Sequence, residues 1–140
     1  MNVQALNRYI LQGIRKDVYE DRIELFVPFF FEKSENGPLR LVWSKDGVLS
    51  DKGRTVSELK TRLGDLSPYR NKIQNVLNAF GTVSLEGGQN LVVRSFQTVI
   101  SGDEEYKDYL GGLNKLLRAI SQISIIDRID VDPHGTVSIC

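Results

Sequence analysis

The chain has very little cysteine and histidine. Of its 140 residues, only Cys140 is a cysteine and only His134 is a histidine. A single cysteine can form neither an intrachain disulfide nor a cysteine-based zinc site, and this lone histidine has no visible triad pattern around it. We therefore expect no cofactor and no metal, and the cysteine usage fits a reducing, cytoplasmic setting.

The chain also lacks an excess of either charge and a long apolar run. Eighteen lysines and arginines balance eighteen aspartates and glutamates, so there is no overall attraction to nucleic acid or to an anionic membrane. No apolar run approaches the ~20 residues that cross a bilayer, and the first residues lack the apolar core of a signal peptide. We expect no membrane partner.

What is present is an ordinary globular composition with both helical and strand periodicity. The hydrophobic fraction is 41% and the charged fraction is 26%, both typical of a domain that buries a core. Helical spacing predicts helices over about residues 2–15, 55–63, 68–80 and 103–126. Ser67 should be the N-cap of the third, with Pro68 in its first position. Alternation predicts strands over about residues 22–32, 39–45 and 48–51, with a tight turn at Asp46-Gly47 between the last two. It also predicts a hairpin around Gly87-Gly88 and two short strands near the C-terminus.

This order of elements indicates an α+β fold. We expect an antiparallel sheet of about five strands, made of a three-strand meander and a hairpin and packed with three to four helices. Residues 1–127 should form a single domain, and residues 128–140 a C-terminal tail or small hairpin.

The densest motif lies between Gly47 and Leu59. Asp51-Lys52-Gly53 is typical of a tight turn, and Thr55-Val56-Ser57-Glu58 matches a capping box. In that box the Thr55 oxygen accepts the amide of Glu58, and the Glu58 carboxylate accepts the amide of Thr55. Turn and cap chemistry would then leave only Lys52, Arg54 and the spare lone pairs of Asp51 unexplained.

The same region supplies the candidate binding residues, which are Asp51, Lys52, Arg54, Lys60 and Arg62. Asp51, aided by Lys52 and Arg54, could bind a metal or phosphate at a helix N-terminus. The basic residues, which continue along the chain to Arg70 and Lys72, could form a patch for nucleic acid or an acidic protein. The alternative is a solvated helix face. Glu58-Leu59-Lys60 has the E-x-K spacing of some metal-dependent nucleases, but it falls on a helix, so we name no catalytic residue.

Aromatic residues gather in the first predicted strand. Phe26 and Phe30 lie on its second face, opposite Phe29 and Phe31, and Pro28 indicates an edge position or a bulge. If 140 residues cannot cover both faces, Phe26 and Phe30 become an interface for a homodimer or a host protein.

Pro28-Phe29, followed by Leu49-Ser50-Asp51-Lys52-Gly53-Arg54-Thr55 and Leu59, resembles an uncharacterised prokaryotic and phage family known as domain of unknown function 1828. The resemblance covers about residues 5–126. The chain departs from the family pattern at Phe30-Phe31-Glu32-Lys33, where acidic and polar residues are expected. The resemblance implies a small protein of a bacterium or mobile element, with no enzyme activity to carry over.

These observations favour a binding protein over an enzyme. We expect a non-enzymatic protein–protein interaction protein of a bacterium or mobile element, such as an inhibitor in phage defence or counter-defence, whose partner is a host or phage protein. The alternative is a nucleic-acid-binding or metal-dependent nuclease-like domain that uses Asp51, Lys52, Arg54 and Lys60.

Overall fold

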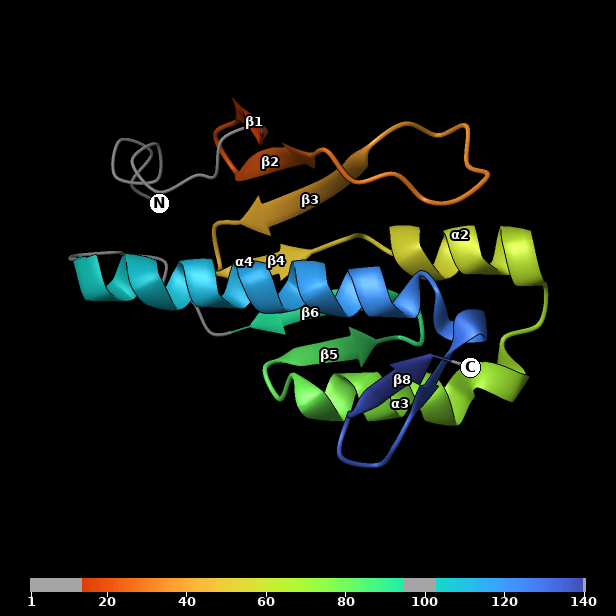
Figure 1. The fold of residues 1–140 in the computed structure, drawn as a ribbon. Helices are drawn as coiled ribbons and strands as arrows, with labels where there is room; N and C mark the ends of the chain where they lie inside the picture. The colour runs from red at the N-terminus through yellow and green to blue at the C-terminus, as the bar shows by residue number, and fades with distance from the viewer. Residues whose placement is uncertain (1–13, 95–102, 140) are drawn as a thin grey trace.

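The computed structural model describes the backbone of residues 14–94 and 103–139, and the side chains of its longest helix from residue 111 onward. The elements in chain order are β1 (Arg15–Val18), β2 (Arg22–Val27), β3 (Leu39–Ser44), β4 (Val48–Ser50), α2 (Arg54–Leu63), the 3-10 turn η1 (Ser67–Tyr69), α3 (Arg70–Ala79), β5 (Val83–Glu86), β6 (Asn90–Arg94), α4 (Asp103–Ile123), the 3-10 turn η2 (Ile126–Arg128), β7 (Ile129–Val131) and β8 (Val137–Ile139) (Figure 1). The predicted α+β class is confirmed.

A six-stranded antiparallel sheet with the order β1-β2-β3-β4-β6-β5 forms the centre of the molecule. Cross-strand pairing places Ile23, Trp43, Leu49, Val93 and Val83 in one row across five strands. These side chains are all buried and belong to one hydrophobic core. α4 packs on the sheet over β5 and β6. Figure 1 shows α4 lying across the sheet and α3 lying beyond β5.

The sheet has one more strand than predicted, because β1 pairs with β2. The helix predicted over residues 2–15 lies mostly outside the described residues, but its last residue, Arg15, begins β1 instead. That end of the helix prediction was wrong. Strand pairing between Arg15 and Phe26 decides the conformation of Arg15, and helical spacing contains no information about such a partner.

The predicted strand over residues 22–32 ends at Val27. After Pro28 the chain turns, and the amide of Phe29 donates to the carbonyl of Val27 at 2.7 Å. The turn directs Phe31 into the core, where it is buried, and the rings of Phe29 and Phe31 pack edge to face with centroids 5.1 Å apart. A proline without an amide donor therefore ends the strand rather than placing it at the sheet edge.

Phe26 and Phe30, the predicted interface pair, have different environments. Phe26 is half-buried, and the guanidinium of Arg15 lies 4.2 Å from its ring centroid, a cation–π contact that covers one side of the ring. Phe30 is 67% exposed. Whether Phe30 meets a second copy or another protein stays a prediction.

The helix predicted over residues 68–80 also begins differently from expectation. Ser67 was predicted to cap a helix with Pro68 in its first position, but η1 begins at Ser67, with Leu66 as its N-cap, and α3 begins only at Arg70. The amide and hydroxyl of Ser67 are instead bonded to Oδ1 of Asp65, at 3.0 and 2.8 Å. Asp65 therefore supplies the polar acceptor that was assigned to the serine.

The two short C-terminal strands form a hairpin that packs on α3. Ile129 and Val131 of β7 are buried in the core, and the ammonium of Lys72 on α3 donates to the carbonyl of Ile129 at 2.8 Å. At the hairpin turn Gly135 has φ +86°, and a Cβ there would lie 2.3 Å from the Cβ of Ala79. The turn therefore requires glycine for both its conformation and its close approach to α3.

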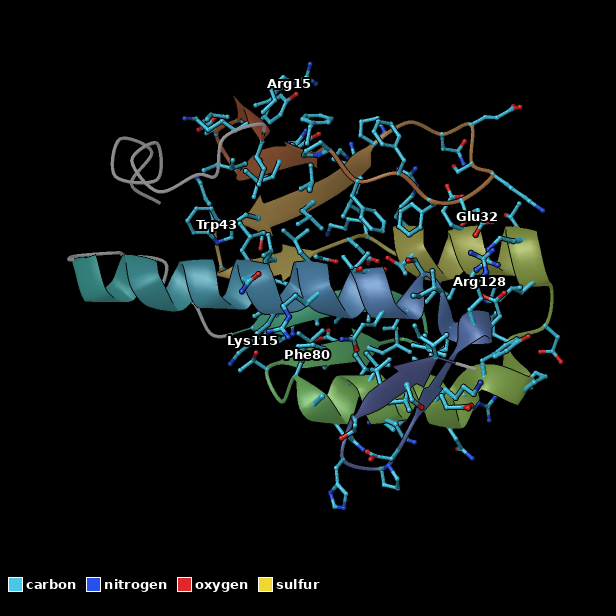
Figure 2. The ribbon with its side chains drawn as sticks, in the orientation of Figure 1. Arg15, Glu32, Trp43, Phe80, Lys115 and Arg128 are labelled. Atoms are coloured by element: carbon cyan, nitrogen blue, oxygen red, sulfur yellow. The ribbon has the colours of Figure 1, made fainter. Side chains whose placement is uncertain are left out.

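Figure 2 shows a further link between distant segments, where Glu32 and Arg128 face each other in an ion pair. None of the helices in the described part of the chain is long and apolar enough to cross a membrane.

Candidate functional site

Asp51, the first candidate residue, lies in a tight turn between β4 and α2. Lys52 and Gly53 both have positive φ, at 53° and 81°, and the amide of Arg54 donates to the carbonyl of Asp51 at 3.1 Å. These angles and this hydrogen bond define a type I′ turn. Gly53 suits its position because glycine, which has no Cβ, adopts positive φ without a steric clash. Lys52 adopts the same left-handed conformation, which is sterically unfavourable for a residue with a Cβ.

The Asp51 carboxylate is buried and holds three backbone amides. Its Oδ1 accepts from the amides of Gly53 and Leu91 at 2.9 and 3.0 Å, and its Oδ2 accepts from the amide of Thr55 at 3.1 Å. Its own amide donates to the carbonyl of Leu91 at 3.1 Å. Asp51 therefore fastens the first turn of α2 to β6, and its lone pairs are largely used for that purpose.

The predicted capping box does not form. The N-cap of α2 is Gly53, with no side-chain cap, so Thr55 lies inside the helix. Its hydroxyl oxygen is buried without a hydrogen-bond partner among the described residues. Asp51, which precedes the N-cap by two residues, accepts the amide of Thr55 instead. The tight turn starts the helix two residues earlier than the box requires, and this displaces both of its members.

Glu58, the other member of that box, instead holds the loop between β2 and β3. Its Oε1 accepts from the hydroxyl of Ser34 at 2.8 Å, the amide group of Asn36 at 2.8 Å and the Nε of Arg54 at 2.9 Å. Burial raises the pKa of Glu58, but the hydrogen bonds from Asn36, Ser34 and Arg54 outweigh it, so the pKa lies below its ordinary value.

Arg54 is occupied by the same loop. Besides its bond to Glu58, its terminal nitrogens donate to the carbonyls of Pro38 and Gly37 at 3.1 and 2.7 Å. Its guanidinium carbon lies 5.1 Å from the ring centroid of Phe31. A guanidinium with these partners is held in one orientation, so Arg54 contributes to the structure of the loop more than to an open basic surface.

The five candidate binding residues are divided among three places. Three of them line a hollow of about 260 Å³ at the start of α2, whose full lining is Arg40, Asp51, Lys52, Gly53, Arg54 and Ser57. Lys60 faces a different hollow, described below. Arg62 makes a two-pronged ion pair with Asp127, at 3.0 and 2.9 Å, and donates to the carbonyl of Ser124 at 2.8 Å.

Arg62 thereby joins the end of α2 to the segment that follows α4. Its guanidinium, bonded to the carboxylate of Asp127, holds the pKa of that group below its ordinary value. No group of three or more histidine, cysteine, aspartate or glutamate side chains that could hold a metal ion occurs within the described ranges. The E-x-K pair of Glu58 and Lys60 thus has no described acidic cluster around it.

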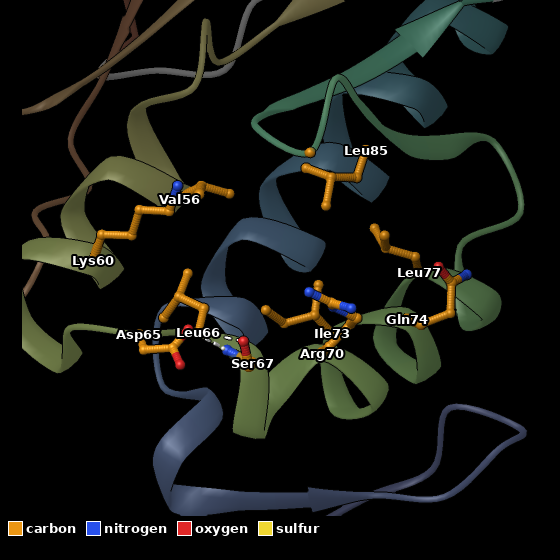
Figure 3. A pocket seen from close by; sticks show the side chains of 11 residues that line it. Val56, Lys60, Asp65, Leu66, Ser67, Arg70, Ile73, Gln74, Leu77 and Leu85 are labelled. Atoms are coloured by element: carbon orange, nitrogen blue, oxygen red, sulfur yellow. Dashed lines mark hydrogen bonds between the residues drawn. The ribbon is translucent and has the colours of Figure 1, made fainter.

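A larger hollow, of about 400 Å³, lies between α2, α3 and the turn that joins β5 to β6 (Figure 3). Its apolar lining comes from α2, the connection to α3, α3 itself and β5, and consists of Val56, Leu66, Ile73, Leu77 and Leu85. Lys60 and Arg70 also line it, and both are exposed. Neither lies within ion-pair distance of a described carboxylate. Asp65 also lines the hollow, where Ser67 is bonded to it; these hydrogen bonds, and to a lesser extent the charge of Arg70, hold the pKa of Asp65 below its ordinary value.

A second hollow, of about 390 Å³, extends the first along β5 and α3. The two share Gln74, Leu77 and Leu85, and the second continues past Val83 and Ser84 of β5 to Gly81. Together they form one continuous depression, which we call the α3–β5 groove. Of its lining residues, only Lys60 was among the candidate binding residues. Because the groove is assembled from separate segments, no local pattern marks it.

With this geometry described, the chain can be set beside other proteins. Comparisons with known protein families, with curated proteins and with solved structures find no match. Recognition is therefore argued from the hollows and the charges around them, and the biological setting from the sequence resemblance alone.

Proposed function

We propose that this chain is a non-enzymatic protein–protein interaction protein, and that the α3–β5 groove is its recognition surface. The observation that carries the proposal is the composition of the groove. Apolar side chains line it, and Lys60 and Arg70 stand beside them without internal ion pairs in the described chain. An apolar depression with a few charged groups at its margin suits the side chains of a partner protein.

The carboxylates near the predicted site support this choice over a reaction. Asp51 and Glu58 accept hydrogen bonds from fixed backbone and side-chain donors, and Asp127 is paired with Arg62. A catalytic acid or base needs a proton position that substrate can reach. Here the carboxylate oxygens accept hydrogen bonds from backbone and side-chain donors that stabilise the fold.

The biological setting follows from the resemblance to the prokaryotic and phage family. We propose that the partner is a host or phage protein and that binding inhibits it, in phage defence or in counter-defence. A homodimer that uses the exposed Phe30 is compatible with this proposal, because Phe30 and the α3–β5 groove involve separate residues.

The test is affinity purification with the full chain from bacterial cells carrying phage, followed by reconstitution with the purified candidate partner. Light scattering should give a complex of defined stoichiometry, and the chain with Mg²⁺ should leave DNA and RNA intact. The Lys60→Glu, Arg70→Glu double variant is the matched control and should lose the complex. Failure to reconstitute any complex, together with measurable turnover of DNA or RNA, would contradict the proposal.

A second candidate is nucleic-acid binding at the hollow beside α2. The favouring observation is that Lys52 is exposed there next to Arg40, which is bonded to Glu24 at 3.1 Å. Phosphate contacts release counterions, so such binding should weaken steeply with salt, and Lys52→Ala should reduce the salt slope by about 1. DNA binding that is absent or independent of salt excludes this candidate.

A further inference from the structure

We propose that the partner contributes an extended segment, which adds to the exposed edge of β5 as a seventh strand, with an acidic residue close to Lys60 and Arg70. This inference rests on the proposed function and specifies how recognition occurs. Each step of it comes from a separate feature: the position of β5, the direction of its backbone groups, the composition of the strand and the charges beside the groove.

The first feature is position. In the strand order β1-β2-β3-β4-β6-β5, β5 pairs only with β6, so its other side is an edge. The α3–β5 groove runs along that edge, between Val83, Ser84 and Leu85 on one side and α3 on the other. Figure 3 shows Leu85 and Leu77 on one side of the hollow and Val56 and Lys60 on the opposite side.

The second feature is the direction of the backbone groups of Leu85. This residue lies opposite Leu91. The amide of Leu91 donates to Oδ1 of Asp51, and its carbonyl accepts from the amide of Asp51, so both groups point away from β5. In an antiparallel pair, two opposite residues either both bond to each other or both face outward. The amide and carbonyl of Leu85 therefore face the groove.

Val83, two residues earlier, has the same orientation. Its amide donates to the carbonyl of Phe80 in the connection from α3, at 2.7 Å, which confirms that its backbone groups point away from β6. No described residue bonds to the carbonyl of Val83 or to the amide or carbonyl of Leu85. One donor and two acceptors are thus available in a row, the arrangement that an added strand requires.

The third feature is the contrast between the two edges of the sheet. The opposite edge strand, β1, has the sequence Arg15-Lys16-Asp17-Val18, with three charged residues. Charges on an edge strand discourage the pairing of another chain. β5 has the sequence Val83-Ser84-Leu85-Glu86, without lysine or proline. Its one charged residue, Glu86, is paired with Arg94 of β6. The edge that borders the groove therefore has fewer charges than the opposite edge.

The fourth feature is charge. An added strand alternates its side chains between two faces, so an apolar side chain can enter the hollow beside Leu77 and Leu85. Lys60 and Arg70 line the same hollow as Leu85 and Gly88, with Lys60 on the side opposite Leu85. A carboxylate of the partner segment in this hollow would meet both cations. The occupant we propose is therefore an extended, acidic segment with at least one large apolar residue.

The experiment starts with a displayed library of random 12-residue peptides, selected on the full-length chain. A selected peptide is then synthesised with single N-methyl groups at successive backbone positions, and its affinity is measured by fluorescence anisotropy. Strand addition predicts an alternating result: N-methylation of every second residue weakens binding at least tenfold, and N-methylation of the residues between changes it less than twofold. Amide exchange of Leu85 should slow at least tenfold in the complex.

Charge variants give the matched control. Lys60→Glu with Arg70→Glu should weaken the selected peptide at least tenfold, whereas Lys45→Glu, at an exposed lysine in the β3–β4 turn, should leave its affinity unchanged. A library without binders, or N-methyl effects that do not alternate, would overturn the inference. A partner protein that still binds the double variant would overturn this inference and the assignment of the groove as the recognition surface, while the proposal that the chain binds a protein would stand. The absence of any partner counts against the proposed function itself.

Discussion

The tight turn over residues 51–54, which we call the Asp51 turn, and the α3–β5 groove differ in how many of their polar groups have hydrogen-bond partners. In the Asp51 turn, one buried carboxylate accepts three backbone amides, and the neighbouring Arg54 and Glu58 bond to each other and to a loop. In the groove, backbone groups of Leu85 and the cations of Lys60 and Arg70 have no such internal partners within the described chain.

The comparison teaches that a dense polar motif can be a requirement of the fold. A turn followed directly by a helix leaves several amides without acceptors, and the sequence must supply acceptors nearby. A binding surface is expected where hydrogen-bonding groups have no partner within the fold and apolar side chains line an open hollow. Four experiments, in order of decreasing expected effect, test this difference.

Asp51→Ala should have the largest effect. It leaves the amides of Gly53, Thr55 and Leu91 buried without their acceptor, so the free energy of unfolding should fall by about 3 kcal/mol or more. Urea denaturation measures the loss. Ser57→Ala, at an exposed position lining the same hollow, should change stability by less than about 0.5 kcal/mol. If Asp51→Ala unfolds like the parent chain, the carboxylate is available for function and the comparison fails.

Arg62→Ala should have a smaller effect, because its ion pair with Asp127 is only partly buried. The side chains are 13% and 19% exposed, and removal of the guanidinium also leaves the carbonyl of Ser124 without that donor. We expect a loss of about 2 kcal/mol in the free energy of unfolding. The exposed pair of Arg94 and Glu86 is the control, and Arg94→Ala should cost less than about 1 kcal/mol. Equal losses would mean that burial does not separate the two pairs.

Acid should weaken the loop that Glu58 holds. Because the folded-state pKa of Glu58 lies below the ordinary glutamate value of about 4.3, its stabilisation is complete above that pH and is lost as the pH falls through the folded-state pKa. The free energy of unfolding, measured between about pH 6 and pH 3, should therefore decrease less in Glu58→Gln than in the parent chain. Parallel curves for the two proteins would show that Glu58 does not contribute to the acid dependence.

The groove variants should have the smallest effect on stability. Lys60 and Arg70 are exposed and have no internal ion pair in the described chain, so Lys60→Glu and Arg70→Glu should each change the free energy of unfolding by less than about 0.5 kcal/mol. Thermal and urea denaturation would measure this. A loss above about 1 kcal/mol would place these cations among the structural residues and remove the contrast with the Asp51 turn.

Much of the fold could be predicted from local pattern, and its exceptions have specific causes. Strand alternation predicted β2, β3 and β4, and the Asp46-Gly47 turn between the last two, because adjacent strands in a hairpin are determined by short-range sequence. β1 was missed because its strand conformation depends on pairing with β2. The capping box failed because a tight turn at Asp51 set the helix start first.

The candidate site was less accessible to prediction. Asp51, Lys52 and Arg54 do line one hollow, since they are consecutive or nearly so in the chain. Lys60 and Arg62 lie six and eight residues beyond Arg54, which is about 9 and 12 Å further along the helix. The two residues between them rotate their side chains apart by more than half a turn. Arg62 forms an ion pair with Asp127, which is 65 residues away in the sequence. No pattern in α2 could have indicated that partner.

The sequence by itself determined the α+β class, the buried row of the sheet and the polar demands of the turn at Asp51. Those properties follow from periodicity and from backbone amides that must be satisfied locally. Only the tertiary structure decided which charged residues are used internally and which face the α3–β5 groove. The reason is that β5 becomes an edge, and the groove becomes a hollow, only when α2, α3 and the β5–β6 hairpin are brought together around the core.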